Sequence, residues 1–377
     1  MQNRTDPVAL TAALVRAPSV TPEDHGCQAL LTGPLQALGF TVHDLSEQGI
    51  PNFYARLGDT APVVCFAGHT DVVAPGPEDD WKHPPFAAEQ SDGHLYGRGT
   101  ADMKGALAAM LCAVEQTLAS GPLSGSVAFL VTGDEEGDAA HGTRHMVEWL
   151  EARGELPDYC IVGEPSSTEV LGDTIKNGRR GSVSGTLTIH GVQGHVAFPE
   201  RADNPIHRAM PVLAALASRH FDDGDDHFQP TRLQITNIAS GVGASNVTPG
   251  NLTAMFNLRF SPASTPESID AQVRRLLDDH GISYDLEWIV SGHPFLTESG
   301  PLTDAMREAT HAVTGRTPEL STTGGTSDAR FIAPKGVAVA ELGLVNKTIH
   351  KVDESVPVAD IQALAAIYKG VLERLLG

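Results

Sequence analysis

Short apolar runs and longer amphipathic segments alternate along the first part of the chain. Residues 62–69 (PVVCFAGH), 125–132 (GSVAFLVT) and 158–164 (DYCIVGE) are apolar runs of strand length. Between them, 103–120 and 142–154 have the spacing of helices. The apolar residues on one face of the first predicted helix are Met103, Leu107, Met110, Leu111, Val114 and Leu118. Strands that alternate with helices predict βαβ units, and therefore an α/β fold with a mainly parallel sheet flanked by helices.

The pattern changes near residue 180 and changes back near residue 293. Within 180–292 the predicted order is strand, helix, two strands, helix and strand, which is typical of a two-layer α+β module. After it the α/β pattern returns, with two helices around the strand 336–343. We therefore expect residues 1–179 and 293–377 to form one domain, into which 180–292 is inserted.

Length and composition limit the class of protein. At 377 residues the chain exceeds the usual size of a single core, so two domains are expected. The formal net charge of −21 argues against a nucleic acid or an anionic membrane as a partner, because both attract basic surfaces. The four cysteines form no CxxC pair and favour buried thiols in a reducing compartment, which indicates a cytoplasmic protein. The first residues fit an amphipathic helix better than a signal peptide, and no apolar run is long enough for a membrane span.

Acidic residues and one histidine collect where the predicted strands end. These residues are His69, Asp71, Asp102, Glu135, Glu136 and Glu164. The carboxyl ends of strands in an open α/β sheet are where ligands bind, so we expect these side chains to converge. Acids that converge without a cation would repel one another and raise their own pKa values. Two divalent metal ions would remove that penalty, and histidine with Asp and Glu is the ligand set of a hydrolytic zinc pair.

Each acid also has an interpretation without metal. Asp102 could cap the helix that follows it, and Glu164 before Pro165 could be an ordinary turn acid. The segment 97–105 (GRGTADMKG) lacks the third glycine of a dinucleotide-binding loop, and TTGGTSD contains no Gly-x-Ser-x-Gly elbow of a serine hydrolase. Acids at three successive strand ends, each in a turn with glycine, favour the metal site.

Motifs along nearly the whole chain carry a resemblance to a known family. They are GHTDVV (68–73), LYGRGTADMKG (95–105), TGDEEG (132–137), IKNGRRGS (175–182), QGHVAFP (193–199), ASNVTPG (244–250), STTGGTSDARF (321–331) and TIHKVDE (348–354). With them the chain resembles the zinc-dependent amidohydrolase and peptidase family that includes acetylornithine deacetylase, aminoacylases and glutamate carboxypeptidases. NGRRGS, GGTSDARF and NKTIHKVDE are most similar to members that remove a succinyl group from an acylated diamino diacid. In one departure, Phe198 and Glu200 stand where relatives usually carry Tyr and His.

The resemblance implies two Zn²⁺ per subunit, for which Co²⁺ can substitute. Asp102 would bridge the two ions, and a cis peptide bond would follow it. The other implied ligands are His69 and Glu164 on one ion and Glu136 and His350 on the other. Asp71 would orient the imidazole of His69. Glu135 would be the general base that takes a proton from the attacking water and later returns it to the leaving amine.

The resemblance also implies how substrate and partner bind. A substrate with several carboxylates would be held by Arg179, Asn246, Arg259, Gly325, Thr326 and Asn346. The basic stretch 175–180 (IKNGRR) could be a solvated hinge, or it could offer the planar fork of Arg179 to a carboxylate. The inserted module would be a dimerisation or lid domain. In a homodimer, His195 would reach the partner's active site and stabilise the oxyanion.

The expected activity is hydrolysis of N-succinyl-L,L-2,6-diaminopimelate to succinate and L,L-2,6-diaminopimelate, a step of lysine and cell-wall precursor synthesis. The alternative is acetylornithine deacetylase or a related N-acyl-amino-acid deacylase, because motif and fold determine the chemistry better than the substrate. A metal-dependent binding protein without turnover is a third hypothesis, which the presence of Glu135 disfavours.

Overall fold

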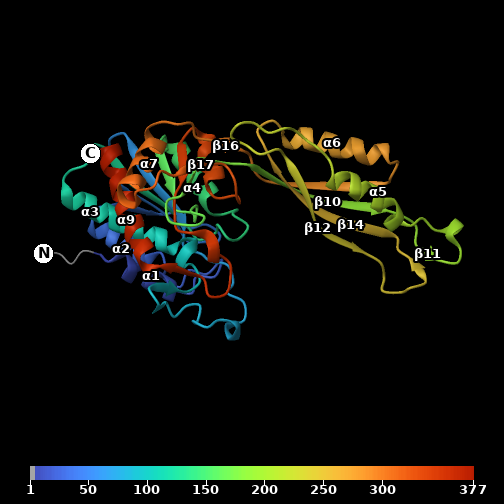
Figure 1. The fold of residues 1–377 in the computed structure, drawn as a ribbon, viewed down its shortest axis with the longest axis horizontal. Helices are drawn as coiled ribbons and strands as arrows, with labels where there is room; N and C mark the ends of the chain where they lie inside the picture. Colours follow the sequence, from blue (N-terminus) through green and yellow to red (C-terminus); the bar gives the residue numbers. More distant parts are fainter. Residues whose placement is uncertain (1–4) are drawn as a thin grey trace. The chain divides into compact units, whose positions relative to one another are not determined.

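In the computed structural model, the described chain, residues 5–377, passes between two units that each have a hydrophobic core (Figure 1). Unit 1 comprises 5–178, Leu296–Ser321 and Ser327–Gly377, and unit 2 comprises Arg179–Phe295 and Thr322–Thr326.

The observed division differs from the expected one mainly at one short segment. The chain enters unit 2 one residue before, and leaves it three residues after, the expected boundaries. Thr322–Thr326, which we expected in the first domain, belongs to unit 2. Two arginine contacts within unit 2 explain why this segment belongs there. Arg179 Nη1 donates to the carbonyl of Thr323 at 3.0 Å, and Arg259 Nη1 donates to Thr326 Oγ1 at 2.6 Å.

Among the described residues, unit 1 is built on an eight-stranded sheet. In spatial order its strands are β1 (Thr41–Asp44), β2 (Asn52–Leu57), β6 (Ser126–Thr132), β3 (Val63–His69), β7 (Tyr159–Val162), β18 (Ala338–Glu341), β8 (Thr174–Lys176) and β17 (Glu319–Ser321). The strands from β6 to β18 run parallel, as do β8 and β17, whereas β1, β2 and β6 pair antiparallel. β3 and β6 are buried along their whole length, which explains their continuous apolar sequences. The predicted α/β fold with a mainly parallel sheet is confirmed.

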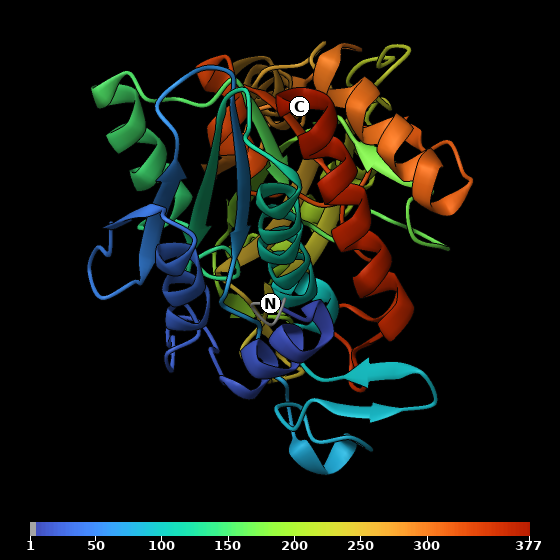
Figure 2. The ribbon, with the colours of Figure 1, turned by 90° about the vertical axis from the view of Figure 1, so that its left-hand side faces the viewer.

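Helices cover both faces of this sheet. They are α1 (Pro7–Arg16), α2 (Ala29–Ala37), α3 (Gly105–Ser120), α4 (Thr143–Arg153), α7 (Pro301–Thr314), α8 (Ala329–Ile332) and α9 (Val358–Leu376). α3 and α9 lie side by side on one face, with α1 and α7 packed against them (Figure 2). On the opposite face, Trp149 of α4 lies 6.0 Å from Tyr54 of β2 between ring centroids. The adjacent Phe53 belongs to the core around α3, as the alternation of a strand requires.

The helix α3 is buried more completely than its sequence predicts. We expected one apolar face, but every residue from Gly105 to Val114 is buried. α1 and α9 pack against the helix, and β3 contacts it from the sheet. Gly68 of β3 allows this close approach, because a Cβ at that position would collide with the side chain of Met103.

Shorter elements complete unit 1. A three-stranded sheet contains β19 (Ser355–Pro357), β5 (His94–Tyr96) and β4 (Glu89–Ser91) in that order among the described residues. A two-stranded pair joins β9 (Gly178–Arg179) and β16 (Phe295–Leu296), where the chain passes between units. Short helical turns are η1 (Glu78–Asp80), η2 (Thr100–Lys104), η4 (Ala333–Lys335) and η5 (Asn346–Thr348).

Unit 2 is a four-stranded antiparallel sheet with helices on one face, within the part of the chain described. In order its strands are β12 (Arg232–Ser240), β14 (Asn251–Phe260), β10 (Gly181–His190) and β15 (Tyr284–Gly292), and its helices are α5 (Pro205–Ala217) and α6 (Pro266–Asp279). Alternate residues of β14 are buried against these helices. A short pair, β11 (Gly194–His195) with β13 (Val247–Thr248), and the turn η3 (Pro199–Arg201) follow the end of β10. The predicted two-layer α+β module is confirmed.

Both helices of unit 2 begin with a capping side chain followed by proline. Asn204 and Thr265 each precede a proline and accept a hydrogen bond from a backbone N–H in the first turn of α5 and α6. The four cysteines are buried free thiols, as expected. No helix in residues 5–377 is long and apolar enough to cross a membrane.

A buried lysine ties α1 to the turn that precedes α3. The side chain of Lys104 is fully buried. Its ammonium donates to the carbonyl of Leu14 at 2.9 Å and to the carbonyl of Ala17 at 2.8 Å. Burial lowers the pKa of Lys104, although nearby acids act in the opposite direction. These hydrogen bonds hold the end of α1 against the segment that carries Asp102.

We predict that Lys104→Met lowers the free energy of unfolding by about 2–4 kcal/mol, because two buried carbonyls lose a charged donor while the apolar stem is kept. Urea denaturation followed by circular dichroism measures the loss. The matched control is Lys335→Met, which breaks an ion pair of 2.5 Å with the exposed Glu151 and should change stability by about 0.5 kcal/mol or less. Equal stability of the two variants would show that Lys104 does not anchor α1.

Candidate active site

Three strand ends meet at one edge of the central sheet. β3 ends at His69, which lies opposite Thr132 at the end of the parallel strand β6. β7 is parallel to β3 on its other side, with Ala67 opposite Val162. The turn after β6 therefore brings Glu135 and Glu136, and the turn after β7 brings Glu164, to the edge occupied by His69. This convergence is the one that the sequence pattern predicts.

Asp102 lies between two histidines. Its Oδ1 is 3.3 Å from His69 Nε2, and its Oδ2 is 3.3 Å from His350 Nε2. Glu164 Oε1 lies 3.7 Å from His69 Nε2, and Glu136 Oε1 lies 3.0 Å from His350 Nε2. Each histidine thus has the same pair of acidic neighbours that the resemblance assigns to one metal ion. The structure also has a cis peptide bond between Asp102 and Met103, as implied.

Asp71 holds the turn that carries the two adjacent glutamates. Its carboxylate accepts hydrogen bonds from the backbone N–H of Glu135 at 3.3 Å, the N–H of Glu136 at 3.1 Å and the hydroxyl of Thr21 at 2.7 Å. The Nδ1 of His69 lies 2.9 Å from the backbone carbonyl of Asp71 and 3.6 Å from its carboxylate. The closest partner of the imidazole is therefore the Asp71 backbone, while the side chain mainly positions the glutamates.

Burial sets the electrostatics of these acids. It raises the pKa of Glu164 well above the usual value, and the charge of Asp102 adds to the effect. It raises the pKa of Glu135 in the same way, together with the charge of Asp328. Hydrogen bonds that the His350 imidazole donates to the carboxylates of Asp102 and Glu136 raise the pKa of His350 to about 10. These carboxylates can be ionised at the same time only if positive charge lies near them.

These residues offer possible metal-ligand atoms in two overlapping groups that share His69. His69, Asp102 and Glu136 form one group whose ligand atoms lie within 4.8 Å of one another, and His69, Glu135 and Glu164 form a second. The Oε1 atom of Glu164 is buried without a hydrogen-bond partner, which is a costly state for a carboxylate oxygen unless a cation faces it. Imidazole together with carboxylate oxygens suits zinc and similar ions.

Sequence reasoning did not single out Glu354. Its fully buried carboxylate accepts hydrogen bonds from the N–H of Ala101 at 2.9 Å and the N–H of Asp102 at 3.2 Å. Arg98 neutralises it through an ion pair of 2.6 Å. Glu354 therefore fixes the backbone around Asp102. The only signal was its place at the end of TIHKVDE, four residues after His350 in the sequence.

The residues expected to bind substrate fall into separate groups. Arg179 and Arg259 lie in unit 2 with Gly325 and Thr326, held by the contacts with 322–326 described above. Asn346 lies in unit 1, where its N–H donates to the carbonyl of Ser167 at 2.9 Å in the loop before His350.

His195 and Asn246 form another group within unit 2. His195 pairs with Val247 across β11 and β13, and the carbonyl of Asn246 accepts a hydrogen bond from Val196 N–H at 3.1 Å. Both side chains are exposed. The ten residues of β10 separate this group from Arg179, which corresponds to roughly 30 Å at the rise of a strand. The arginine group and the His195 group therefore occupy opposite ends of the same unit.

Comparison with known proteins agrees with this geometry. A model of peptidase family M20/M25/M40 matches residues 65–374. The chain belongs to this family. It is therefore an enzyme of a family of metal-dependent hydrolases, and the resemblance seen in its motifs is confirmed.

Curated members of the family are similar over nearly the full length. A succinyl-diaminopimelate desuccinylase of Magnetococcus marinus is 57% identical over 373 residues, which cover 98% of this chain and 98% of that one. The protein of the same name from Thioalkalivibrio sulfidiphilus is 54% identical, with 99% of each chain covered.

Solved structures of the family share the fold. The M20 family metallo-carboxypeptidase Sso-CP2 from Sulfolobus solfataricus has a TM-score of 0.84 at 17% identity, covering 98% of this chain and 99% of that one. The YXEP protein of Bacillus subtilis, described as a dinuclear metal-binding peptidase, has a TM-score of 0.73 at 16% identity, covering 99% and 98%.

We predict that Asp71→Asn lowers kcat by about 10–100-fold with little change in KM, because an amide cannot replace both acceptor oxygens that position Glu135 and Glu136. Steady-state kinetics of the purified variant measures this split. The matched control is Asp173→Asn, which alters a carboxylate that accepts backbone hydrogen bonds from Thr168 and Glu169 in another loop. An unchanged kcat in Asp71→Asn would show that its carboxylate has no positioning role.

Proposed function

We propose that the chain hydrolyses N-succinyl-L,L-2,6-diaminopimelate to succinate and L,L-2,6-diaminopimelate in the cytoplasm, in the synthesis of lysine and cell-wall precursors. The observation that carries this proposal is the identity of 54–57% over nearly the whole chain to proteins named succinyl-diaminopimelate desuccinylase. The convergence of His69, Asp102, Glu136, Glu164 and His350 supports it, because amide hydrolysis without a nucleophilic side chain needs a metal site of this kind.

The metal ions that we propose are two Zn²⁺, which Co²⁺ can replace. Asp102 would bridge them. The remaining ligands would be His69 with Glu164 on one ion and Glu136 with His350 on the other. Bound there, the ions would offset the charge of the buried carboxylates and polarise the scissile carbonyl as Lewis acids.

The proposed general base is Glu135. Burial raises its pKa, which suits a group that must take a proton from water and keep it until the amine leaves. The hydrogen bond from the Glu135 N–H to the carboxylate of Asp71 fixes the backbone from which the Glu135 side chain extends. Glu135 would return the proton to the nitrogen as the C–N bond breaks, so that succinate and a neutral amine are released.

Substrate selection would depend on the guanidinium groups of unit 2. Arg179 and Arg259 are the proposed partners of the substrate carboxylates, with Asn246, Gly325, Thr326 and Asn346 as further contacts. A planar guanidinium binds a carboxylate through two parallel hydrogen bonds, which an ammonium cannot do. This local positive charge would be needed in a protein whose formal net charge is −21.

Assays of the metal-loaded protein with succinylated and acetylated substrates test the proposed function. We expect kcat/KM for N-succinyl-L,L-2,6-diaminopimelate to exceed that for N-acetyl-L-ornithine by roughly 10²-fold or more, because acetylornithine lacks the further carboxylates that the proposed arginines would bind. A preference for acetylornithine would favour the sister deacylase activity instead.

Substitutions of the two adjacent glutamates should differ in their effects on zinc content and on kcat. We expect Glu135→Gln to keep near-normal zinc content and to lose at least ~10²-fold in kcat, because the amide cannot accept the proton. Glu136→Gln should lose zinc affinity, since it removes a charged ligand. Metal analysis and kinetics on the same preparations make the comparison. Equal zinc loss in both variants would mean that the two roles are wrongly assigned.

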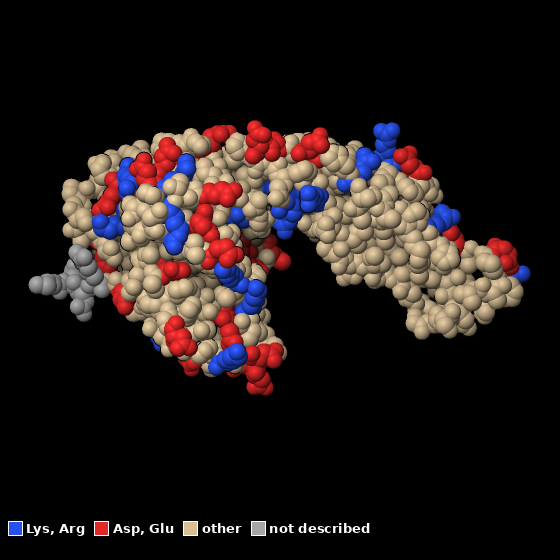
Figure 3. Space-filling view, viewed as in Figure 1, with Lys and Arg blue, Asp and Glu red and all other residues tan. Residues whose placement is uncertain are grey.

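We also propose a homodimer formed through unit 2. β12 is an edge strand of its sheet and carries no charged side chain from Leu233 to Ser240. Uncharged edges of this length are templates for pairing with another strand. Met210 on α5 and Ile238 on β12 expose 62% and 54% of their surface. Lys, Arg, Asp and Glu are sparse over the strands on the visible face of this unit (Figure 3). A second copy would cover this surface.

In such a dimer, His195 would act in the partner's active site as a donor to the oxyanion. Co-expression of Glu135→Gln with His195→Ala tests this, because each mixed dimer would contain one site with both intact residues. Random pairing makes half of the dimers mixed, so about a quarter of wild-type activity should return. Mixed dimers that are isolated and remain inactive would contradict action across the interface.

A further inference from the structure

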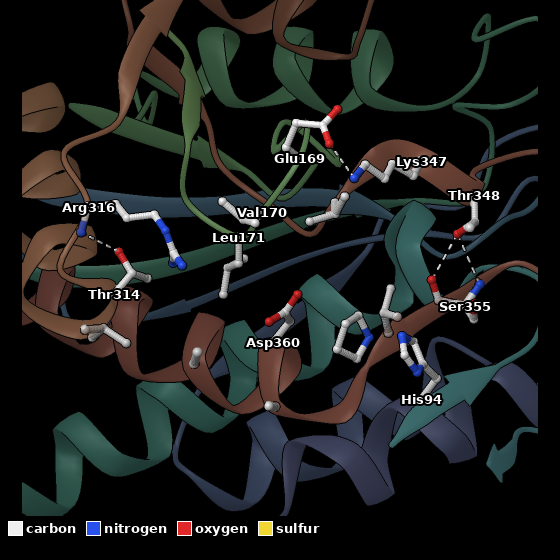
Figure 4. Close-up of a pocket in the computed structure, with 16 residues that line it drawn as sticks. His94, Glu169, Val170, Leu171, Thr314, Arg316, Lys347, Thr348, Ser355 and Asp360 are labelled. Atoms are coloured by element: carbon white, nitrogen blue, oxygen red, sulfur yellow. Dashed lines mark hydrogen bonds and ion pairs between the residues drawn. The ribbon is translucent and has the colours of Figure 1, made fainter. Parts of the chain in front are cut away.

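Unit 1 contains a cavity that the proposed metal ligands do not line. Its volume is about 620 Å³. The walls come from the loop 169–171, the end of α7 with the residues after it, the segment 345–348, and β19 with the first turns of α9 (Figure 4). None of the five proposed metal ligands lines it. Cavities of 300–1,000 Å³ commonly hold small organic ligands.

The cavity has an apolar floor and an apolar rim. Leu171 and Val356 are 4% and 1% exposed and form part of its base. Val170 and Val313 expose 42% and 39% of their surface beside it. A ligand with an aliphatic part would cover these two valines and gain the free energy of removing apolar surface from water.

Two oppositely charged side chains of the cavity make no hydrogen bond and no close ion pair among residues 5–377, although the charge of one, Arg316, acts on the other, Asp360. Arg316 forms no side-chain hydrogen bond or ion pair within the described chain, and neither does Asp360. Figure 4 shows both side chains extending toward the same central space, with Leu171 between them. Lys347, the other cation of the lining, is already paired with Glu169 at 2.5 Å. One guanidinium and one carboxylate are thus available to a ligand.

We propose that this cavity binds a free amino acid with an aliphatic side chain, whose carboxylate pairs with Arg316 and whose ammonium pairs with Asp360. The aliphatic side chain would lie on Leu171, Val170 and Val313. A dicarboxylate is a poorer match, because it would place one of its charges near Asp360 without a free cation. Burial raises the pKa of Asp360, and the charges of Arg316 and His94 oppose this rise. An ammonium group would further favour the ionised carboxylate.

The position of the cavity makes this ligand an effector of the enzyme. Lys347, Thr348 and Ser355 line it, and His350 and Glu354 lie between these residues in the sequence. Thr348 Oγ1 donates to the carbonyl of Ser355 at 2.9 Å and accepts from its N–H at 3.2 Å, which closes the segment into a loop. A ligand held against this loop would bias the position of His350. Binding should therefore change the kinetics.

Calorimetric titration of the metal-loaded full-length protein with L-leucine tests the site. We expect a Kd of about 1 mM or below for the wild type, as is reasonable for a ligand of this size. Arg316→Gln and Asp360→Asn should each weaken binding at least ~10-fold and leave kcat without leucine unchanged. Arg153→Gln, which alters an exposed arginine of α4 outside the cavity, should bind leucine as the wild type does.

Two analogues of leucine test its two charged groups one at a time. 4-Methylpentanoate lacks the ammonium group and isoamylamine lacks the carboxylate, so each should bind at least ~10-fold more weakly than leucine. Absence of leucine binding at 20-fold above the expected Kd, or binding that both cavity variants retain, would overturn the site. Equal affinity for either analogue would overturn the charge assignment. Binding that changes neither kcat nor KM would overturn the effector role.

Discussion

The structure depends on the repulsion among carboxylates that are buried at one edge of a parallel sheet. Asp102, Glu136 and Glu164 are within 3.7 Å of the imidazoles of His69 or His350, and one oxygen of Glu164 is buried without a hydrogen-bond partner. Burial penalises the negative charge of Glu164, and the charge of Asp102 adds to this penalty. Such an arrangement is stable in its ionised form only with positive charge near the oxygens, so the same feature that costs free energy in the fold supports the proposed metal site.

The surrounding residues keep these acids in position. The parallel register of β3, β6 and β7 brings their turns together, and Asp71 fixes the backbone of Glu135 and Glu136. Glu354 accepts from the backbone at Asp102 and is itself neutralised by Arg98. These contacts satisfy buried polar groups near the site and hold the backbone of the proposed ligands in place before a metal ion binds.

Local sequence pattern predicts the strands of the central sheet and the turns that carry several of the site residues. Apolar runs predicted the strand that ends at His69 and the turns, after the next strands, that carry Glu135, Glu136 and Glu164. His350 lies in a loop after η5 and not at a strand end, so only the resemblance pointed to it. Glu354 could not be found from periodicity, because its partner Ala101 is 253 residues away in the sequence. The assignment of 322–326 to unit 2 likewise depends on contacts with distant arginines. The unpaired charges of Arg316 and Asp360 have no sequence signal at all.

The central claim is that the buried acids form a site for two divalent cations. Titration of metal-free protein with Zn²⁺, followed by calorimetry and by elemental analysis of the gel-filtered product, tests it most directly. The account predicts two equivalents bound per chain, with hydrolysis absent in the metal-free protein and restored as the site fills. Retention of full hydrolytic activity after complete removal of metal, or failure to bind Zn²⁺, would contradict it.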